Sequence, residues 1–402
     1  MKVFMMDLPR VGYKKSIDLL YKCSSEHGFY ASSKKRANYR RVWARDGVIT
    51  GLAALLTGEE RLINAFRKTL DTLLKFQGRQ GEIPSNVSPE SKRVSYGTLA
   101  GRVDSPLWYV LGCVKYYNQT RDQEFLDLHY PAIVKVISLL ESWEFNQRGF
   151  IFVPRSGDWA DEMPRQGYLL YDQVLYYQAL TEFIKIRKVR GDSFSYWVKK
   201  KNKLKRRIEV NFGPDKVEKK DRKYIYHQAI FDKLNKNSSY WIESFDVETK
   251  RFDFFANSLV ILFGLSTKEQ SQKIIEYATE ISQNSLIPAF YPIIKRGDKD
   301  WEELQVSFLF EFKNKPYLNH NGGLWPMING FYAAALRRSD RKDLAEHCLE
   351  EITKANYLDR REGGSWGFYE YLHGKKKTPE GTPYMAWNAA GQIFAFKSGK
   401  II

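Results

Sequence analysis

The connections between helical segments alternate in character along this chain, and this alternation constrains the fold more than any other feature. Apolar residues recur at helical spacing along most of the sequence, and few stretches show the alternation of a β-strand. Some connections are short and polar, such as TGEE at 57–60, whereas others are long and rich in Trp, Gly, Pro and acidic residues, such as 152–167. The predicted helices are Val48–Leu56, Glu60–Phe76, Val103–Asn118, Asp122–Trp143, Leu169–Arg187, Phe194–Val210, Phe252–Gly264, Lys268–Gln283, Leu324–Arg337, Lys342–Ala355 and Tyr384–Phe396.

This rhythm predicts about eleven or twelve helices paired as hairpins, with short turns at one end and long loops at the other. Such hairpins can close into an all-α toroid, in which an inner and an outer ring of helices pack back to back. Binding and catalytic residues are then expected where the long loops cluster. An open solenoid is the alternative, although no fixed-period repeat is visible. No Pro/Gly/Ser-rich linker divides the chain, so we expect one domain over residues 1–402.

Composition excludes several classes of protein. The longest apolar stretches, Leu259–Leu265 and Ala333–Leu336, are far shorter than the roughly 20 residues that a membrane-spanning helix needs. The first ten residues, MKVFMMDLPR, lack the features of a secretory signal. Three widely spaced cysteines, Cys23, Cys113 and Cys348, form neither a disulfide framework nor a metal motif. We therefore expect a protein of the reducing cytoplasm that has no membrane partner and no metal site.

The chain is basic, with 64 Lys and Arg residues against 47 Asp and Glu residues and a net charge of +17. The densest run is KKKNKLKRR at Lys199–Arg207, inside a basic helical and loop region at about 190–225. No zinc-finger spacing, RRM signature or GxxG loop accompanies it. The run is therefore interpreted as a solvated helix face, and we do not expect a nucleic-acid partner. No feature of the sequence predicts an oligomeric state.

Acidic residues inside two of the long loops are the candidates for chemistry. Asp158, Asp161 and Glu162 flank Trp159, and Glu370 lies within the aromatic segment WGFYEYLHG. Aromatic neighbours partly remove water from a carboxyl group, which raises its pKa and suits it to proton transfer near pH 7. Two facing carboxyl groups are the minimal apparatus for cleaving a glycosidic bond. For each acid taken alone, a helix cap or an ion pair remains the simpler interpretation.

Five motifs in order carry a resemblance to a known superfamily: YRRVWARDG (Tyr39–Gly47), GRVDSPLW (Gly101–Trp108), SGDWADEMP (Ser156–Pro164) with YDQVLYYQAL (Tyr171–Leu180), NGGLWP (Asn321–Pro326), and YEY with WNAAG (Tyr369–Tyr371, Trp387–Gly391). They resemble the motifs of the inverting (α/α)6-barrel glycoside hydrolases, and most closely those of the neutral/alkaline invertase family. Amylo-α-1,6-glucosidases, trehalases and cellobiose phosphorylases share parts of the pattern. The resemblance implies an (α/α)6 toroid barrel of helical hairpins.

The resemblance also implies roles for individual residues. Asp161 matches the general acid and Glu370 the general base. The residues that we expect to bind the substrate are Tyr39, Trp43, Arg45, Asp46, Asp104, Trp108, Asp158, Trp159, Gln173, His320, Asn321, Trp325, Trp366, Tyr369 and Trp387. One departure is evident: the invertases follow their catalytic aspartate with Arg-Arg-Met-Gly, whereas Glu162, Met163 and Pro164 follow Asp161 here. The basic region at Lys199–Lys223 also has no counterpart in the motif series.

From the resemblance we expect an inverting, exo-acting glycoside hydrolase for a small α-glucoside, with sucrose as the first candidate and no cofactor. The alternatives are an α-glucosidase for another linkage, either α-1,6 or a compatible-solute glucoside, and a phosphorylase with a basic phosphate pocket. A hypothesis from a different class is a non-catalytic barrel that binds carbohydrate or RNA. No competing chemistry is indicated, because the chain lacks a GxSxG elbow, a P-loop, a GxGxxG turn after a strand and an HExxH helix.

Overall fold

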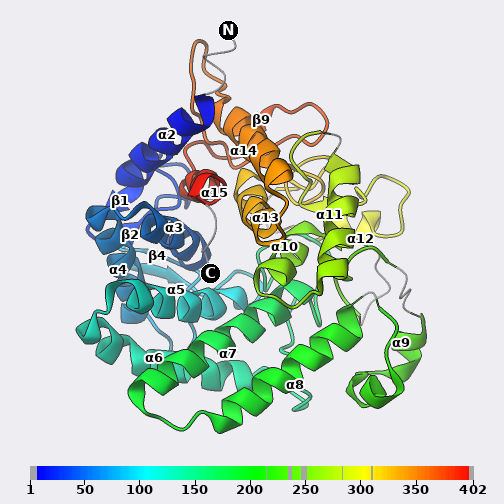
Figure 1. The fold of residues 1–402 in the computed structure, drawn as a ribbon. Coiled ribbons are helices and arrows are strands. Elements are labelled where there is room, and N and C mark those ends of the chain that lie inside the picture. Colours follow the sequence, from blue (N-terminus) through cyan, green and yellow to red (C-terminus); the bar gives the residue numbers. More distant parts are fainter. Residues whose placement is uncertain are drawn as a thin grey trace.

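The computed structural model describes residues 7–213, 215–233, 238–245, 251–282, 284–308 and 311–397, and within them twelve long helices form two concentric rings (Figure 1). The inner ring consists of α3 (Ala44–Thr57), α5 (Asp104–Thr120), α7 (Leu170–Arg190), α10 (Phe254–Leu262), α13 (Pro326–Arg338) and α15 (Ala386–Lys397). The outer ring consists of α2 (Leu8–Cys23), α4 (Glu60–Lys75), α6 (Gln123–Ser142), α8 (Ser195–Phe212), α11 (Lys268–Ser282) and α14 (Lys342–Tyr357). Each inner helix packs against the next, and α15 packs against α3. The ring is therefore closed, which confirms the toroid and excludes the open solenoid.

Burial separates the two rings in the way that the sequence dictates. All nine residues of α10 are buried, and α13 is buried from Pro326 to Leu336. The outer helix α4 instead buries one face only, at Leu62, Ala65, Phe66, Thr69, Leu70 and Leu73. A helix that is apolar all round belongs inside, whereas an apolar stripe at helical spacing belongs at the interface with one layer.

Small residues allow two inner helices to approach closely. A Cβ atom placed on Gly330 of α13 would lie 2.4 Å from the Cα atom of Gly391 in α15. No larger residue fits at this crossing, which explains why glycine interrupts two otherwise strong helical patterns.

Eleven of the long helices lie where they were predicted, with ends that differ by a few residues. Gln283, the predicted end of one helix, lies outside the described residues. The helix that was missed is α2, whose buried face includes Gly12 and Ser16 beside Leu19, Leu20 and Cys23. Small and polar residues on the buried face weaken the apolar periodicity, so the pattern did not reveal this helix. The single domain over 1–402 stays a prediction.

The remaining elements are short and belong to the connections. They are η1 (Lys219–Tyr224), α9 (Gln228–Lys233), α12 (Trp301–Gln305), and the strands β1 (Ser24–Ser25), β2 (Gly28–Phe29), β3 (Val42–Trp43), β4 (Asn86–Ser88), β5 (Arg93–Ser95), β6 (Phe252–Asp253), β7 (Phe290–Tyr291), β8 (Tyr371–Leu372) and β9 (Pro379–Glu380). The strands pair antiparallel as β1–β2, β3–β4–β5, β6–β7 and β8–β9. Among the described residues, no helix is long and apolar enough to cross a membrane.

The six inner helices run in the same direction, because each is separated from the next by an antiparallel outer helix. Their N-termini meet at one end of the barrel, where the long loops also lie. Four of these N-termini carry an acid in the first turn or at the cap, namely Asp46, Asp104, Asp172 and Asp253. Partial positive charge at a helix N-terminus stabilises a carboxylate there. The fold thus gathers acidic side chains at one end of the barrel, which we call the mouth.

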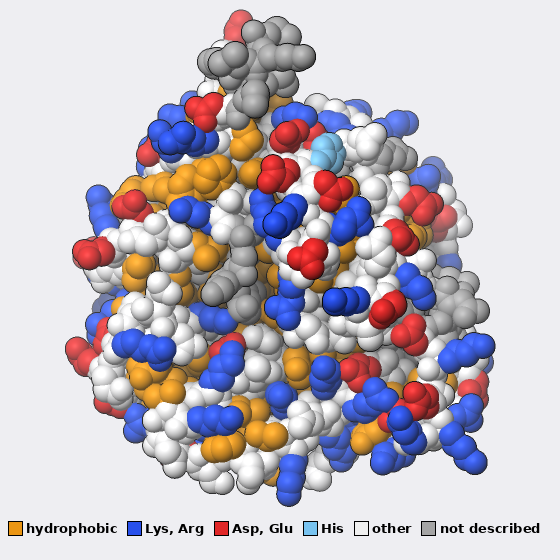
Figure 2. All heavy atoms as spheres, viewed as in Figure 1, with side chains coloured by type: hydrophobic (Ala, Val, Ile, Leu, Met, Phe, Trp, Pro, Cys, Tyr) orange, Lys and Arg blue, Asp and Glu red, His pale blue; other side chains and the backbone are white. Residues whose placement is uncertain are grey.

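The basic run lies on α8, and ion pairs take up part of its charge. Lys200 pairs with Glu144 at 2.6 Å and with Glu141 at 3.2 Å, while Arg206 pairs with Glu209 at 2.8 Å and also with Asp221. Figure 2 shows basic and acidic side chains intermingled over one face of the molecule. The charge of this region is partly used to fix α8 against its neighbours. Residue 214, within the region, lies outside the described residues.

Candidate active site

The loop that carries Asp161 connects α6 to α7 and is held in place from two sides. On one side, the Nη1 group of Arg102 donates to the carbonyl oxygens of Ser156 and Asp158, both at 2.8 Å. On the other, the Asp158 carboxylate accepts from the Ala160 backbone N–H at 3.0 Å and lies 3.1 Å from the Nε atom of Arg165. Both Arg102 and Arg165 are buried, so the loop has a defined shape at the mouth.

The Asp161 carboxyl forms an ion pair with the Nη2 group of Arg102, and its side chain is 31% exposed. Burial alone would raise the pKa of Asp161. The charge of Arg102 and its hydrogen bond, together with His320 and Arg45, outweigh burial, so the pKa of Asp161 is lowered from its ordinary value. Asp161 is therefore ionised at neutral pH in the free protein.

Glu370 lies on a different loop, directly before β8, and is 9% exposed. Its Oε1 atom accepts from the Tyr39 hydroxyl at 2.7 Å, and its Oε2 atom accepts from the Thr382 backbone N–H at 3.2 Å. Its own carbonyl accepts from Asn388 Nδ2 at 3.2 Å. A Cβ atom on Gly381 would lie 2.5 Å from Oε2, so the chain after β9 closes directly over the carboxyl. Tyr39, Thr382 and Gly381 thus surround the carboxyl group, and Asn388 fixes the backbone of Glu370.

The pKa of Glu370 is raised, chiefly by burial, although the hydrogen bonds from Tyr39 and Thr382 oppose the shift. The charge of Asp161 contributes to this increase, and both carboxyl groups also raise the pKa of the Tyr39 hydroxyl. Asp161 and Glu370 are 209 residues apart in the sequence. At the mouth they are close enough for the charge of Asp161 to affect the pKa of Glu370. The structure brings the two predicted catalytic residues together.

Arg45 and Asp46 occupy the first turn of α3, where Trp43 is the N-cap residue. The Asp46 carboxyl is 4% exposed. Burial raises its pKa to about 7, with Arg45 lowering it and Glu370 adding to the increase. Asp46 therefore lies beside the general-base candidate rather than serving as the helix cap.

A network of buried polar side chains holds the Arg45 guanidinium in place. Its Nη1 group lies 2.7 Å from Asp104 Oδ2, which also accepts from the Tyr171 hydroxyl at 3.2 Å. The Trp108 indole N–H in turn donates to the Tyr171 hydroxyl at 2.9 Å. Asp104 and Trp108 are both fully buried. These two predicted site residues support Arg45 from within the core.

Aromatic rings make up the next layer of the mouth. The Trp159 ring lies edge-on to the His320 ring at 5.0 Å, and the His320 ring stacks on Trp325 at 5.4 Å. Trp325 stacks on Tyr371 at 5.2 Å and meets Trp387 edge-on at 5.6 Å. This aromatic cluster thus joins the Asp161 loop to the Glu370 loop.

Three buried nitrogen atoms of this aromatic cluster have no hydrogen-bond partner in the described part of the chain. They are Nε1 of Trp159, Nε1 of Trp387 and Nδ1 of His320. Burial lowers the pKa of His320 to about 3, so its ring is neutral at physiological pH. Buried polar groups are normally satisfied, and unsatisfied ones beside two carboxyl groups are available to bind the hydroxyl groups of a ligand.

Other predicted site residues are taken up by the scaffold. The Gln173 amide exchanges two hydrogen bonds with the backbone of Ile151, at 2.8 and 3.1 Å. Asn321 does the same with the backbone of Ile294, at 2.8 and 2.9 Å. Their amide groups hold the backbone of neighbouring loops, and their predicted contact with the substrate stays a prediction.

Three further predicted aromatic residues lie outside this aromatic cluster. Trp366 meets Tyr357 of α14 at 5.3 Å, and its ring would also contact a side chain at position 12 of α2, so it lies against the outer ring. Tyr369 lies under the guanidinium of Arg360 at 5.3 Å. Trp43 donates to the Asn38 carbonyl at 3.0 Å and stacks on Tyr39 at 6.5 Å. Of the three, Trp43 is the one that contacts the Tyr39–Glu370 pair, through the ring of Tyr39.

Arg102 and Asn314 are residues of the site that were not predicted. Arg102 belongs to the GRVDSPLW motif, so it was within reach of the sequence argument, and Glu162 was among the acidic candidates without an assigned role. Glu162 is 11% exposed, lies 3.7 Å from the Lys313 ammonium group, and has a buried Oε2 atom without a hydrogen-bond partner in the described part of the chain. Burial raises its pKa to about 7, with Lys313 opposing the shift and Asp161 and Glu370 adding to it. Asn314, between α12 and α13, donates to the Glu162 carbonyl at 2.9 Å and so joins its own loop to the Asp161 loop, a contact that no local pattern indicates.

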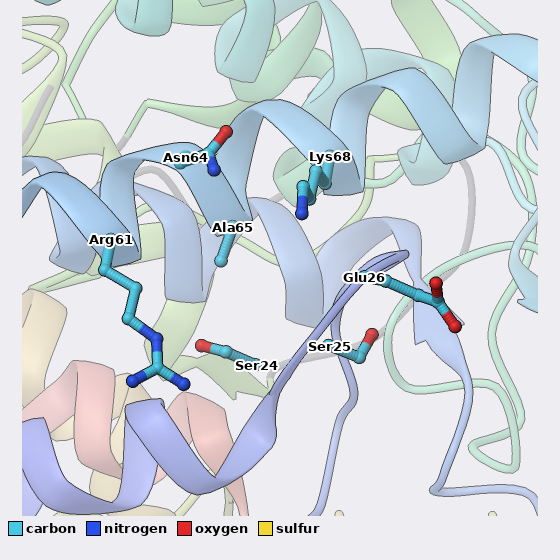
Figure 3. Close-up of a pocket in the computed structure, with 7 residues that line it drawn as sticks. All are labelled: Ser24, Ser25, Glu26, Arg61, Asn64, Ala65 and Lys68. Carbon is cyan, nitrogen blue, oxygen red and sulfur yellow. The ribbon is translucent and has the colours of Figure 1, made fainter.

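A separate polar pocket of about 300 Å³ opens on the outer wall between the β1–β2 hairpin and α4 (Figure 3). It is lined by Ser24, Ser25, Glu26, Arg61, Asn64, Ala65 and Lys68. None of the predicted site residues is among them. Within the described ranges, no group of three or more His, Cys, Asp or Glu side chains is arranged to hold a metal ion.

Comparison with known proteins places this geometry in context. Residues 27–396 match the family described as "Alkaline and neutral invertase". The chain is 24% identical over 424 residues to neutral/alkaline invertase 1, mitochondrial, of Oryza sativa subsp. japonica, covering 90% of this chain and 65% of that protein. It is 24% identical over 414 residues to the probable alkaline/neutral invertase A, chloroplastic, of Arabidopsis thaliana, covering 88% of this chain and 63% of that protein. The chain thus spans somewhat less than two thirds of these relatives.

Solved structures share the architecture at low identity. A mannosylglycerate hydrolase of Thermus thermophilus in complex with Tris superposes with a TM-score of 0.67 at 13% identity, covering 95% of this chain and 99% of that one. A bacterial glucoamylase complexed with acarbose superposes with a TM-score of 0.64 at 14% identity, covering 96% of this chain and 55% of that one. These likenesses establish the (α/α)6 barrel fold.

Proposed function

Because the chain belongs to the alkaline and neutral invertase family, a family of glycoside hydrolases, we propose that it is an inverting, exo-acting glycoside hydrolase for a small α-glucoside, with Asp161 as general acid and Glu370 as general base. The observation that carries the proposal is the setting of Glu370. It is a buried carboxyl oriented by Tyr39 and Thr382 and coupled to a second acid on another loop of the same mouth.

The chemistry assigns one proton transfer to each acid. Asp161 donates a proton to the glycosidic oxygen as its bond to the anomeric carbon breaks. Glu370 removes a proton from the water that attacks the opposite face of that carbon. In this scheme the transition state resembles an oxocarbenium ion, and the carboxyl groups stand about 6.5–9.5 Å apart to admit the water. A single displacement converts an α-glucoside into β-glucose.

The residues around the two acids suit the recognition of a sugar. Asp46, buried beside Glu370, offers a carboxyl to the hydroxyl groups of the ring. The indole N–H groups of Trp159 and Trp387 and one nitrogen of His320 have no partner within the described residues and supply further polar contacts. Their flat rings match the C–H faces of a pyranose. No step of this scheme requires a metal or an organic cofactor.

Sucrose is the first candidate substrate, because the related proteins are named as invertases. A specific observation favours a second candidate, an α-glucosidase for another leaving group, such as an α-1,6 linkage or a compatible-solute glucoside. Glu162 occupies the position that directly follows the catalytic aspartate, where invertases carry arginine. A reversal of charge next to the general acid changes what the leaving-group side of the site can bind.

We place the protein in the cytoplasm, where its three free and buried cysteines would stay reduced. Its partner is the carbohydrate substrate, and the ion pairs of α8 give no reason to invoke a nucleic acid.

Incubation with a panel of α-linked disaccharides and glucosyl polyols, with and without phosphate, tests the proposal. We expect release of free glucose that is independent of phosphate. Proton NMR during the first minutes should show β-glucose first, with the α-anomer appearing later through mutarotation. Early α-glucose would contradict the role of Glu370 as a base, and a strict need for phosphate would identify a phosphorylase instead.

A further inference from the structure

We propose that Arg102 is a positioning residue that keeps the Asp161 carboxyl ionised in the free protein and gives it up to the substrate when a leaving group enters the mouth. The inference rests on the proposed role of Asp161 as general acid. It adds a residue to which the motif series assigns no role.

Arg102 is fixed independently of Asp161. Its backbone N–H donates to the Tyr96 carbonyl at 2.8 Å, and its Nη1 group donates to the carbonyls of Ser156 and Asp158, both at 2.8 Å. The side chain is 6% exposed. The Nη2 group remains for Asp161. The backbone contact fixes the main chain at Arg102. Since a guanidinium is a rigid planar fork, the two carbonyl contacts of Nη1 determine where the Nη2 group points.

The ion pair opposes the chemistry that Asp161 has to perform. A general acid must carry a proton, whereas a neighbouring cation favours the ionised carboxylate. Arg102, His320 and Arg45 favour the charged form of Asp161, and burial opposes them. The carboxyl groups of Glu370 and Glu162 also face Asp161, and their repulsion opposes its ionisation when they are charged. The cationic side favours ionisation overall, and the pKa of Asp161 is lowered.

Glu370 faces the opposite balance. Burial and the charge of Asp161 favour its neutral form, whereas Tyr39, Thr382 and Lys313 favour the charged form, and its pKa is raised overall. When the pair holds one proton, that proton therefore resides on Glu370 in the free protein. Hydrolysis needs it on Asp161.

Arg102 can release Asp161 without losing its own place. If the Asp161 carboxyl turns to a glycosidic oxygen, Arg102 keeps both carbonyl contacts of its Nη1 group, and the loop 156–161 keeps its shape. Asp161 then takes a proton from water, donates it to the leaving oxygen and returns to Arg102 as a carboxylate. The proton that Glu370 takes from the attacking water returns to bulk water, so each turnover balances.

A direct test measures the Asp161 pKa in the free protein without any substrate. Protein labelled with ¹³C at the aspartate carboxyl carbon is titrated by NMR, and the Asp161 signal is assigned with the Asp161→Asn variant. We expect the pKa of Asp161 to lie below its ordinary value in the parent protein. In Arg102→Met it should rise by about one to three pH units, the range over which an adjacent arginine shifts a carboxyl. Arg102→Lys keeps a charge near the loop and should show a smaller rise.

Kinetics supply the second readout. Because loss of Arg102 lets Asp161 hold its proton to higher pH, the alkaline limb of the kcat/KM profile should move upward in Arg102→Met. Its kcat should also fall about tenfold to a hundredfold, the usual result of a misplaced reacting group. Arg102→Lys should recover part of kcat and show a smaller shift of the alkaline limb than Arg102→Met. Arg190→Met is the matched control, because Arg190 pairs with Asp127 in the last turn of α7, at the other end of the barrel.

The outcomes separate the inference from the proposed function. An Asp161 pKa that does not move in a folded Arg102→Met protein would overturn the inference, and so would a pH profile that falls in height without changing shape. If the NMR shift appears and no glycoside is cleaved, the Arg102–Asp161 ion pair stands and the proposed function fails.

Discussion

Removing one oxygen atom, in Tyr39→Phe, probes the general base without touching it. The Tyr39 hydroxyl donates to Glu370 Oε1 at 2.7 Å and is the side-chain donor that this carboxyl accepts from among the described residues. The phenyl ring of the variant fills the same space, and the stacking on Trp43 remains. The change therefore isolates the hydrogen bond.

The expected magnitude follows from the strength of that bond. A hydrogen bond to a charged group contributes about 1.5–3 kcal/mol. Each pKa unit corresponds to about 1.4 kcal/mol, so loss of the donor should raise the pKa of Glu370 by about one to two units. The pKa of Glu370 is already raised by burial, and the variant adds to that shift. Because Glu370 must be ionised to act as a base, activity is lost as the pH falls through its pKa, and the acidic limb of the profile should move upward.

The assay is the pH dependence of kcat/KM on the best substrate of the disaccharide panel, from about pH 4 to about pH 9, a window that spans the carboxyl and neutral ranges. We expect activity about tenfold to a hundredfold lower near pH 5 and a much smaller loss above pH 7. A uniform loss at every pH would mean that Tyr39 positions the substrate and not the base. An unchanged acidic limb would refute the reasoning altogether.

Four further substitutions test the rest of the site. Asp161→Asn and Glu370→Gln should each lower kcat by about 10²–10⁴ while thermal unfolding is unchanged within a few degrees, and losses below about tenfold at both would exclude the pair. Asp46→Ala should lower kcat/KM about tenfold to a hundredfold, the cost of a lost charge-assisted hydrogen bond, with a modest change in Tm; early melting with intact kcat/KM would mark a structural role. Gly381→Ala should displace Glu370 and abolish most activity, because the added Cβ atom would lie 2.5 Å from Oε2 of Glu370. The matched control is Gly58→Ala, where the backbone has the same φ of 75° and nothing lies within 4 Å, so this variant should lose stability alone. Equal activity in the two variants would contradict the account.

The sequence sufficed for the helices and for the loops that carry the acids, because both depend on local spacing. The two rings differ in burial pattern: α4 of the outer ring buries one face, whereas α10 of the inner ring is buried all round, and the apolar periodicity of each segment predicts this difference. The helix α2 was missed because glycine and serine occupy positions on its buried face, which weakens the apolar periodicity of the segment.

The electrostatics of the site could not be predicted in the same way. Aromatic neighbours on the sequence suggested that Asp161 would have a raised pKa, whereas Arg102, from a different loop, lowers it. In the same loop it is Glu162 that has a raised pKa, because burial outweighs the charge of Lys313 from a different loop. Gln173 and Asn321 show the same limit, since backbone groups far along the chain take up their amides. The order of the motifs identifies which residues lie close together, but it does not predict whether the pKa of each acid is raised or lowered there.

The barrel topology accounts for why acids accumulate at one end at all. Six parallel helix N-termini direct partial positive charge toward the mouth, and Asp46, Asp104, Asp172 and Asp253 occupy four of them. Asp104 and Asp253 are paired with Arg45 and Arg165 and serve the scaffold. Burial raises the pKa values of Asp46 and Glu370, and Arg45 opposes the shift at Asp46. Burial also raises the pKa of Asp253, although Arg165 opposes that shift. Burial at the mouth thus favours the neutral form of these carboxyl groups, and the neighbouring arginines oppose it to different degrees.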